Sequence, residues 1–470
     1  SFVYLLLPIF QSENDQQAIG FHDATFKINY KIGQNDKLFL TGFSGHDILK
    51  SKFVYSDDET ENNSFVWGDQ LASLRWNHTF SNKVFSNLSL ITSNFNFDFE
   101  SNNVSIFSGS KVPLSVRTGI NGIEMKYDLS IFSSSSLFLF TGFGAKNNVF
   151  TRLHFDEERN AILAKPKDFG LEYYYYIDAK ARLGEKLKIR SGLRFSGLWN
   201  YGPNFIYTYD PALPPSSDTV VDVQHIKANK TVASFNNLEP RLAVNYQLNE
   251  KNAVKLAYDR LVQYVHLMSN TVGVAPFDVW SHANNYLPPT ITDQYTVEYA
   301  NSTKGINISA DIYYKQMKNL VEFRSNANLF LVKQKEAILV PASIDAYGIE
   351  LSMDKSIGKL QGFLNYTYSR SLIETLSKWE SLQINQGNTY PSNYDRPHIF
   401  NMTLSYPLSN RLTCNSKFTY QSGRPVTLPE GRVGNLFMYS ARNSSRLPSY
   451  HRLDLSFILK PKKEKNKSRR

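Results

Sequence analysis

The sequence predicts an all-β protein, an antiparallel up-and-down transmembrane β-barrel in which about 18 strands can be counted. Two patterns lead to this fold class. Short turns alternate with long polar loops from near residue 20 to near residue 460, and apolar residues alternate with polar ones in the segments between them. Barrels of the outer-membrane type have tight periplasmic turns, longer outer loops and strands that alternate apolar and polar side chains.

The predicted short turns join neighbouring strands into hairpins. They lie at Ile32–Asp36, Ser81–Lys83, Ile131–Ser135, Leu183–Lys186, Leu248–Lys251, Ser302–Gly305, Lys355–Lys359 and Pro407–Asn410. Long polar loops separate the hairpins, at positions that include Asn200–Ala233, Leu267–Thr290, Met317–Asp345 and Leu372–Arg396. We expect consecutive strands to be neighbours in a single sheet, because short connections join adjacent strands.

Alternation with a period of two assigns each residue of a strand to one face of the sheet. The residues that we expect to face lipid are Leu242, Val244, Tyr246, Leu351, Met353, Leu404, Leu455 and Phe457. The residues that we expect to face the lumen are Arg241, Asn245, Glu350, Asn401, Thr403 and Asp454. A shift of one residue in register would exchange the two sets.

A soluble β-sandwich has the same alternation, with its apolar side chains facing inward. Strand length favours the barrel, because the segments tend to run for about ten residues or more, enough to cross hydrocarbon at a tilt. Strand number also favours it, since open sheets rarely exceed about ten strands. Aromatic residues that suit an interfacial girdle often close the apolar face, at Tyr246, Tyr258, Tyr366, Tyr368, Tyr406 and Tyr420.

Composition is compatible with one large barrel spanning 1–460, followed by a basic tail at 461–470. The chain has 470 residues, of which 14% are aromatic, and its mean hydropathy is −0.37. No stretch approaches the roughly 18 apolar residues of a membrane helix. The net charge of +10 is inflated by Lys460–Arg470, which holds seven Lys or Arg and one Glu. We interpret this tail as a solvated end and expect no nucleic acid as a partner.

Motifs for catalysis or metal binding are absent from the sequence. Cys414 is the only cysteine and lies on an apolar face, so the sequence has neither an intrachain disulfide nor a thiolate metal site. The nine His are scattered, and there is no Walker loop, no G-x-G-x-x-G, no H-E-x-x-H and no G-x-S-x-G. We therefore expect no enzyme activity, no catalytic or metal site and no cofactor.

A series of seven motifs resembles the barrel of TonB-dependent outer-membrane receptors, with the closest likeness to the Bacteroidetes branch. The motifs are Asn237-Leu-Glu-Pro-Arg241, Gln263-Tyr-Val-His-Leu-Met-Ser-Asn270, Ala346-Tyr-Gly-Ile-Glu350, Asn365-Tyr-Thr-Tyr-Ser-Arg370, Asn393-Tyr-Asp-Arg-Pro-His398, Ser422-Gly-Arg-Pro425 and Tyr450-His-Arg-Leu-Asp-Leu455. The resemblance implies a barrel of about 22 strands with a plugged lumen. It also implies a place in the bacterial outer membrane and TonB-dependent import of a large ligand. We interpret each motif as fixing strand starts, turns and buried ion pairs rather than as contacting ligand.

Both ends of the chain depart from the pattern of the family. We expect a first strand at Phe2–Phe10 and a last one at Leu453–Lys460, with neither a plug nor a TonB box before them. The expectation is therefore an incomplete barrel whose partners are outer-membrane lipid and the TonB complex, the latter through a plug not present in this chain. Such a polypeptide would neither gate nor couple to energy by itself.

Aromatic residues in the predicted outer loops are the candidates for ligand contact, because ring faces stack on sugar or chelate surfaces. They are Tyr201, Phe205, Tyr207, Tyr209, Trp280, His282, Tyr286 and Trp379. A siderophore site would combine such rings with Arg or Lys, and a glycan site would combine them with Asn and Asp, so siderophore, glycan and peptide ligands stay open. The alternatives to a receptor are a passive 18-stranded porin and a surface binding or adhesion protein.

Overall fold

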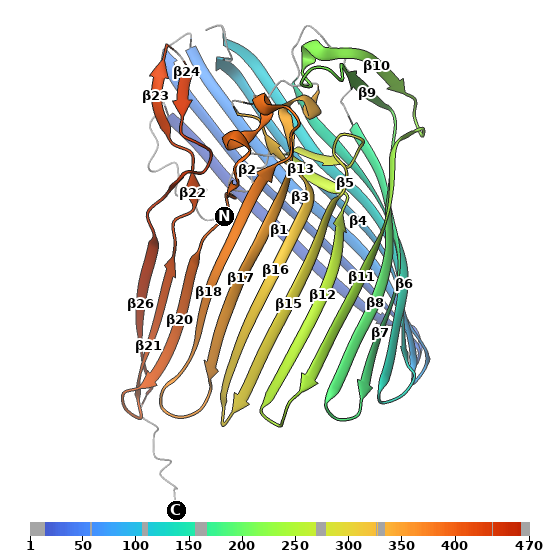
Figure 1. Cartoon of the computed structure of the whole chain (residues 1–470), viewed down its shortest axis with the longest axis vertical. Coiled ribbons are helices and arrows are strands. Elements are labelled where there is room, and N and C mark those ends of the chain that lie inside the picture. The colour runs from blue at the N-terminus through green and yellow to red at the C-terminus, as the bar shows by residue number, and fades with distance from the viewer. Residues whose placement is uncertain are drawn as a thin grey trace, which may run out of the picture.

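The structure is a computed structural model that describes residues 15–56, 59–105, 111–155, 167–268, 279–325, 327, 334–434 and 436–461. Across these residues one antiparallel sheet contains 18 strands and curves around an interior (Figure 1). The prediction of a single all-β antiparallel sheet is confirmed. No helix in the described residues is long and apolar enough to span a membrane.

The strands of the main sheet follow one another in chain order. They are β1 (Asp15–Lys31), β2 (Asp36–Ser56), β3 (Glu59–Ser81), β4 (Val84–Ser105), β5 (Lys111–Phe132), β6 (Leu137–Phe155), β7 (Lys167–Leu183), β8 (Leu187–Tyr201), β11 (Thr231–Gln247), β12 (Asn252–Gln263), β15 (Thr290–Thr303), β16 (Ile306–Phe323), β17 (Leu339–Lys355), β18 (Gln361–Thr375), β19 (Tyr390–Pro391), β20 (His398–Pro407), β21 (Leu412–Gln421) and β26 (Tyr450–Leu459).

Smaller elements lie in the connections at the opposite end from the short turns (Figure 1). Four pairs of short strands form there: β9 (Asn204–Tyr209) with β10 (Val220–Ile226), β13 (Val265–Met268) with β14 (Val279–His282), β22 (Pro425–Val426) with β25 (Ser445–Arg446), and β23 (Pro429–Val433) with β24 (Leu436–Tyr439). Single 3-10 turns are η2 (Ser217–Thr219), η3 (Lys335–Ile338), η4 (Glu380–Leu382) and η5 (Ile384–Gly387).

All eight predicted short turns join consecutive strands of the sheet. The turn between β15 and β16 illustrates their chemistry. Lys304 and Gly305 both have positive φ, 46° and 73°, as a two-residue type I′ hairpin turn requires. Such a turn twists in the same sense as the strands that it joins, and this match fixes their register.

The first third of the chain departs from the predicted alternation. Strand β2 ends at Ser56 and β3 begins at Glu59, so a short connection replaces a long outer loop there. Strands β2 to β5 are 21 to 23 residues long, about twice the 9–11 residues that cross a membrane. The ladder therefore continues beyond the predicted strand ends, where water can solvate both faces and the apolar alternation is no longer required.

The register aligns side chains across the sheet into rows of one character. One apolar row runs through Val244, Leu256, Val297, Ile312 and Ile349. The adjacent polar row runs through Asn245, Lys255, Glu298, Asp311 and Glu350 on the opposite face. The other members of the two predicted face sets follow the same register.

The hairpin of β13 and β14 identifies the inner face. Asp168 of β7 accepts the backbone N–H of His282 in β14 at 3.0 Å, whereas Met268 of β13 packs with Phe323 and Leu339 at the ends of β16 and β17. One hairpin can touch wall strands so far apart in the sheet only from inside the curve. Asp168 therefore points inward, and the register places Arg241 on the same face, as predicted.

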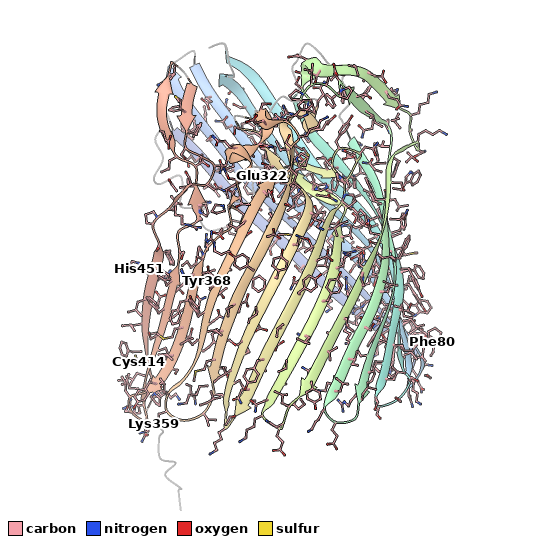
Figure 2. The ribbon with its side chains drawn as sticks, viewed as in Figure 1. Phe80, Glu322, Lys359, Tyr368, Cys414 and His451 are labelled. Atoms are coloured by element: carbon pink, nitrogen blue, oxygen red, sulfur yellow. The ribbon has the colours of Figure 1, made fainter. Side chains whose placement is uncertain are left out.

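Large apolar side chains are exposed on the other face, which we assign to lipid. Leu242, Leu351, Leu455 and Phe457 are 46%, 43%, 60% and 62% exposed. Figure 2 shows side chains along the outside of the wall down to Phe80 near the turn end. A surface of this character in a soluble protein would aggregate, whereas hydrocarbon solvates it.

The two edges of the sheet are β1 and β26. Of the 18 strands, β19 is a two-residue segment that pairs, among the described strands, only with β18, and the other 17 alternate in direction. Because 17 is an odd number, β1 and β26 run in the same direction. A direct pairing between these two edges would therefore be parallel. In the described residues β1 pairs with β2 and β26 pairs with β21. The predicted strand at Phe2–Phe10 lies outside the described residues.

We predict that depth-dependent quenchers will distinguish the two faces. Single cysteines at Val244 and Leu351, in a Cys414→Ser background, should carry labels that lipid-soluble quenchers reach. Labels at Asn245 and Glu350 should respond to water-soluble quenchers, because neighbouring residues in a strand point to opposite faces. Fluorescence quenching in reconstituted vesicles provides the measurement, and water access that is greater at Val244 than at Asn245 would reverse the assignment.

Candidate functional site

Two outer loops that are far apart in the sequence meet at the end of the barrel opposite the short turns. The hydroxyl of Tyr286, in the loop after β14, donates to the carbonyl of Tyr207 in β9 at 2.6 Å. The ring of Tyr286 meets that of Tyr209 edge to face, with centroids 5.6 Å apart. Tyr209 in turn donates to Glu336 Oε1 at 3.0 Å, which joins η3 to the same group.

A pocket of about 50 Å³ opens between these loops. Its lining comes from β9, the start of β11, β14 with the loop after it, and η3: Asn204, Phe205, Ile206, Tyr207, Val232, Ser281, Asn284, Asn285, Tyr286, Leu287 and Glu336. Three of the predicted ligand-contact residues, Phe205, Tyr207 and Tyr286, are therefore brought together from two loops.

Local hydrogen bonds hold the polar residues of the pocket in place. Asn204 Oδ1 accepts the backbone N–H of Phe205 at 2.9 Å. Asn284 Oδ1 accepts those of Tyr286 and Leu287 at 2.9 and 3.0 Å. Burial and the charge of Glu336 raise the pKa values of Tyr209 and Tyr286, so both hydroxyls remain donors at neutral pH.

The β13–β14 hairpin is fixed to the wall by a buried contact. Ser281 Oγ and the backbone N–H of His282 both donate to Asp168 Oδ2, at 3.1 and 3.0 Å, and the His282 ring lies 4.3 Å from that of Phe150. A Cβ at Gly170 would lie 2.5 Å from the His282 ring, so the wall strand needs glycine at this point. His282 is fully buried and positions the hairpin rather than lining the pocket.

The remaining predicted residues lie outside the pocket. Tyr201 is on the outer face of β8, near Trp199 and Phe169, and donates to Asn147 at 2.9 Å. Trp280 pairs with Leu267 within the β13–β14 hairpin. Trp379 lies under the ammonium of Lys378, 4.6 Å from its ring centroid.

The prediction did not include Asn204, Asn284 or Glu336, which supply much of the polar lining of the pocket. They lie in loop segments with no periodicity of their own, so the sequence offered no pattern that could select them. The sole signal was their place in three of the predicted long loops.

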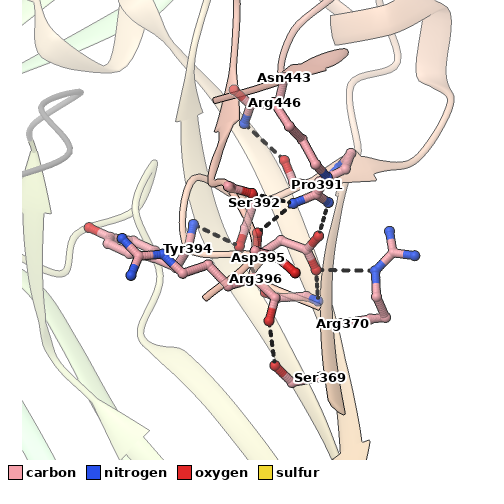
Figure 3. Close-up of polar contacts among 12 residues, drawn as sticks. Ser369, Arg370, Pro391, Ser392, Tyr394, Asp395, Arg396, Asn443 and Arg446 are labelled. Carbon is pink, nitrogen blue, oxygen red and sulfur yellow. Dashed lines mark hydrogen bonds and ion pairs between the residues drawn. The ribbon is translucent and has the colours of Figure 1, made fainter. Parts of the chain in front are cut away.

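A second polar cluster ties the late outer loops to the wall (Figure 3). Asp395 has a fully buried carboxylate, which accepts Arg370 Nε at 3.2 Å and the backbone N–H of Ser371 at 2.7 Å, and it also pairs with Arg446. Arg446 further donates to the carbonyl of Gly423 at 3.0 Å. The motifs 365–370, 393–398 and 422–425 thus meet in one structural cluster.

Two further motifs also have structural roles. Glu239, which is buried, accepts Ser196 Oγ at 2.5 Å and lies 3.5 Å from Arg194. At Gly348 a Cβ would lie 2.5 Å from the carbonyl oxygen of Tyr368 and 2.8 Å from the hydroxyl of Tyr313. These contacts fit the interpretation that the motifs fix strands and buried ion pairs. Across the described residues, no group of three His, Cys, Asp or Glu could hold a metal ion.

Comparison with known proteins identifies the family. Residues 10–464 match the family described as "TonB dependent receptor-like, beta-barrel". The chain belongs to this family. Its proteins are outer-membrane β-barrel receptors and transporters, so the family predicted from the motifs is confirmed. No curated protein sequence matches the chain.

Solved structures of TonB-dependent receptors and related transporters share the fold. The copper transporter OprC has a TM-score of 0.58 at 10% identity, over 95% of this chain and 73% of that protein. The FrpB iron transporter from Neisseria meningitidis has a TM-score of 0.55 at 11% identity, over 97% and 76%. The ferric preacinetobactin receptor BauA from Acinetobacter baumannii has a TM-score of 0.59 at 12% identity, over 94% and 65%. Such low identities relate the folds alone.

We predict that Asp395→Ala will loosen the late outer loops of this TonB-dependent receptor barrel. Removal of the buried carboxylate leaves Arg370 and Arg446 without their partner, at a cost of about 3 kcal/mol. Limited trypsin digestion should then cleave faster at Arg432 and Arg442. The control is Asp454→Ala, which breaks an exposed pair with Arg452 and should leave the digestion rate unchanged. Equal rates for the two variants would contradict a structural role of Asp395.

We also predict that the β13–β14 hairpin will loosen in acid. Burial lowers the pKa of His266 from its ordinary value of 6.5, and its Nε2 lies 3.0 Å from the carbonyl of Pro288. The stability contributed by neutral His266 is complete above pH 6.5 and is lost as the pH falls through the lower pKa of the folded protein.

Hydrogen exchange measures this effect once it is corrected for the intrinsic pH dependence. Peptides that cover Tyr264–Met268 should lose protection as the pH falls, whereas those from β16 should not. His266→Gln, which cannot titrate, should make protection of the hairpin independent of pH. Loss of protection that persists in His266→Gln would assign the effect to another group.

Proposed function

We propose that this chain forms the barrel wall and outer loops of a receptor that imports a large nutrient ligand across the bacterial outer membrane. The pocket between the β9–β10 hairpin and the loop after β14 carries this proposal, because it lies at the end of the barrel that bears the long loops. The ligand is a siderophore, a glycan or a peptide, and Phe205, Tyr207 and Tyr286 contact it.

The partners follow from the same proposal. Outer-membrane lipid surrounds the apolar face, and the TonB complex supplies energy through a plug domain within the lumen. The motifs between Asn237 and Leu455 support a place in the Bacteroidetes branch of the family. The barrel is one domain over 1–460, followed by the tail at 461–470.

The test is uptake in the bacterium that encodes the chain. We expect deletion of the gene to abolish accumulation of one class among labelled ferric siderophores, oligosaccharides and peptides, and we expect a protonophore to do the same in the parent strain. The deletion strain carrying the intact gene is the control. Unchanged uptake of all three classes would contradict the proposal, as would uptake in the parent strain that the protonophore leaves unchanged, which is the behaviour of a porin.

A further inference from the structure

The charge of the outer pocket restricts what it can bind. Glu336 is the one charged residue among the described residues that line it. The guanidinium of Arg324 is engaged elsewhere, since Nη2 donates to the carbonyl of Pro215 at 2.5 Å. Glu336 therefore gives the described lining a negative charge, which repels an anionic ligand such as a ferric chelate with catecholate or carboxylate oxygens on its surface.

The hydrogen-bonding groups of the pocket include both donors and acceptors. The side-chain oxygens of Asn204 and Asn284 accept backbone N–H groups of their own loops, which fixes the side chains and leaves each amide nitrogen available as a donor. Glu336 accepts Tyr209 through Oε1, and its other oxygen can accept a further bond. A ligand hydroxyl, which both donates and accepts, matches this arrangement.

Two exposed aromatic rings border these polar groups. Phe205 is 56% exposed and stacks on His225 with one face, at a centroid distance of 5.0 Å. Tyr286 is 39% exposed, its hydroxyl donates to the carbonyl of Tyr207, and its ring contacts that of Tyr209. Rings held in this way lose little freedom on binding, and they offer flat apolar surface beside the amides and the carboxylate.

The size of the pocket limits how much of a ligand it can enclose. A cavity needs about 10–15 Å³ to hold one water molecule. The pocket of about 50 Å³ therefore holds about four water-sized groups. One edge of a sugar ring has this size, whereas a whole ferric chelate does not. The rest of a chain-like ligand would lie across the exposed surface of Phe205.

We infer that the pocket is a subsite for one terminal sugar of a neutral oligosaccharide, whose hydroxyls bind Glu336 and the Asn204 and Asn284 amides while its apolar face packs on Tyr286. This inference rests on the proposed function and names the ligand class for the same site. Neutral peptides and anionic ferric chelates are the competing ligands that the experiment must separate.

The experiment measures binding to the purified full chain by titration calorimetry. The detergent is an amine oxide, because alkyl glycosides would compete for a sugar site. The probes are neutral hexasaccharides of α-glucan, β-glucan, β-mannan and xylan, a ferric tris-catecholate and hexa-alanine. We expect at least one hexasaccharide to bind and neither the chelate nor the peptide to do so.

Three variants test the assigned contacts. Tyr286→Ala should weaken binding of the hexasaccharide about tenfold through loss of the ring surface, whereas Tyr286→Phe, which keeps the ring, should weaken it less. Glu336→Gln should weaken it about tenfold, because a charged acceptor is replaced by a neutral amide. The control is Val221→Ala on β10, which is 63% exposed and is not part of the lining, and it should leave affinity unchanged.

Two results would overturn the inference. They are binding of none of the hexasaccharides, and binding of the chelate or the peptide that Tyr286→Ala weakens. Heat-modifiable migration of each variant verifies that the barrel is folded. Because gene deletion tests uptake independently of this panel, loss of siderophore or peptide uptake would leave the receptor function standing and reject the sugar subsite alone.

Discussion

The pairing of backbone hydrogen bonds along the sheet is the constraint on which the rest of the structure depends. Hydrocarbon offers no partner to a backbone N–H or C=O, so each must be satisfied between strands. The ladder runs from β1 to β26 in chain order, and short turns keep its register. Register in turn assigns every side chain to lipid or lumen, so one backbone requirement sets the character of both surfaces.

Buried carboxylates connect this wall to the loops. Asp168 and Asp395 are almost completely buried, and burial of a charge is unfavourable unless it is paired and hydrogen-bonded. Asp168 lies on wall strand β7, and Ser281 and the His282 backbone of the β13–β14 hairpin satisfy it. Asp395 lies in the loop before β20 and is paired with Arg370 of wall strand β18 and with Arg446 of β25. Each carboxylate therefore joins a wall strand to an outer loop.

The pocket lies in a part of the molecule that the membrane does not constrain. Most of its residues belong to β9, η3 and the loop after β14, which contact water rather than lipid. Loops supported by a rigid scaffold tolerate change without loss of the fold. Similar barrels occur in a copper transporter, an iron transporter and a ferric preacinetobactin receptor, so the barrel wall by itself does not identify the ligand.

The sequence by itself determined the barrel, its eight short turns and the face of residues such as Val244 and Asn245, because a period of two is a local property of a strand in lipid. It did not determine that β2 and β3 extend beyond the membrane and are joined by a short connection in place of a long loop. The apolar alternation that marks a strand is weak where both faces of the sheet contact water. Only the tertiary structure decided that Tyr286 joins Phe205 and Glu336, and that Tyr201 faces outward. Those contacts depend on how distant loops fold over the lumen, and loops carry no periodic signal.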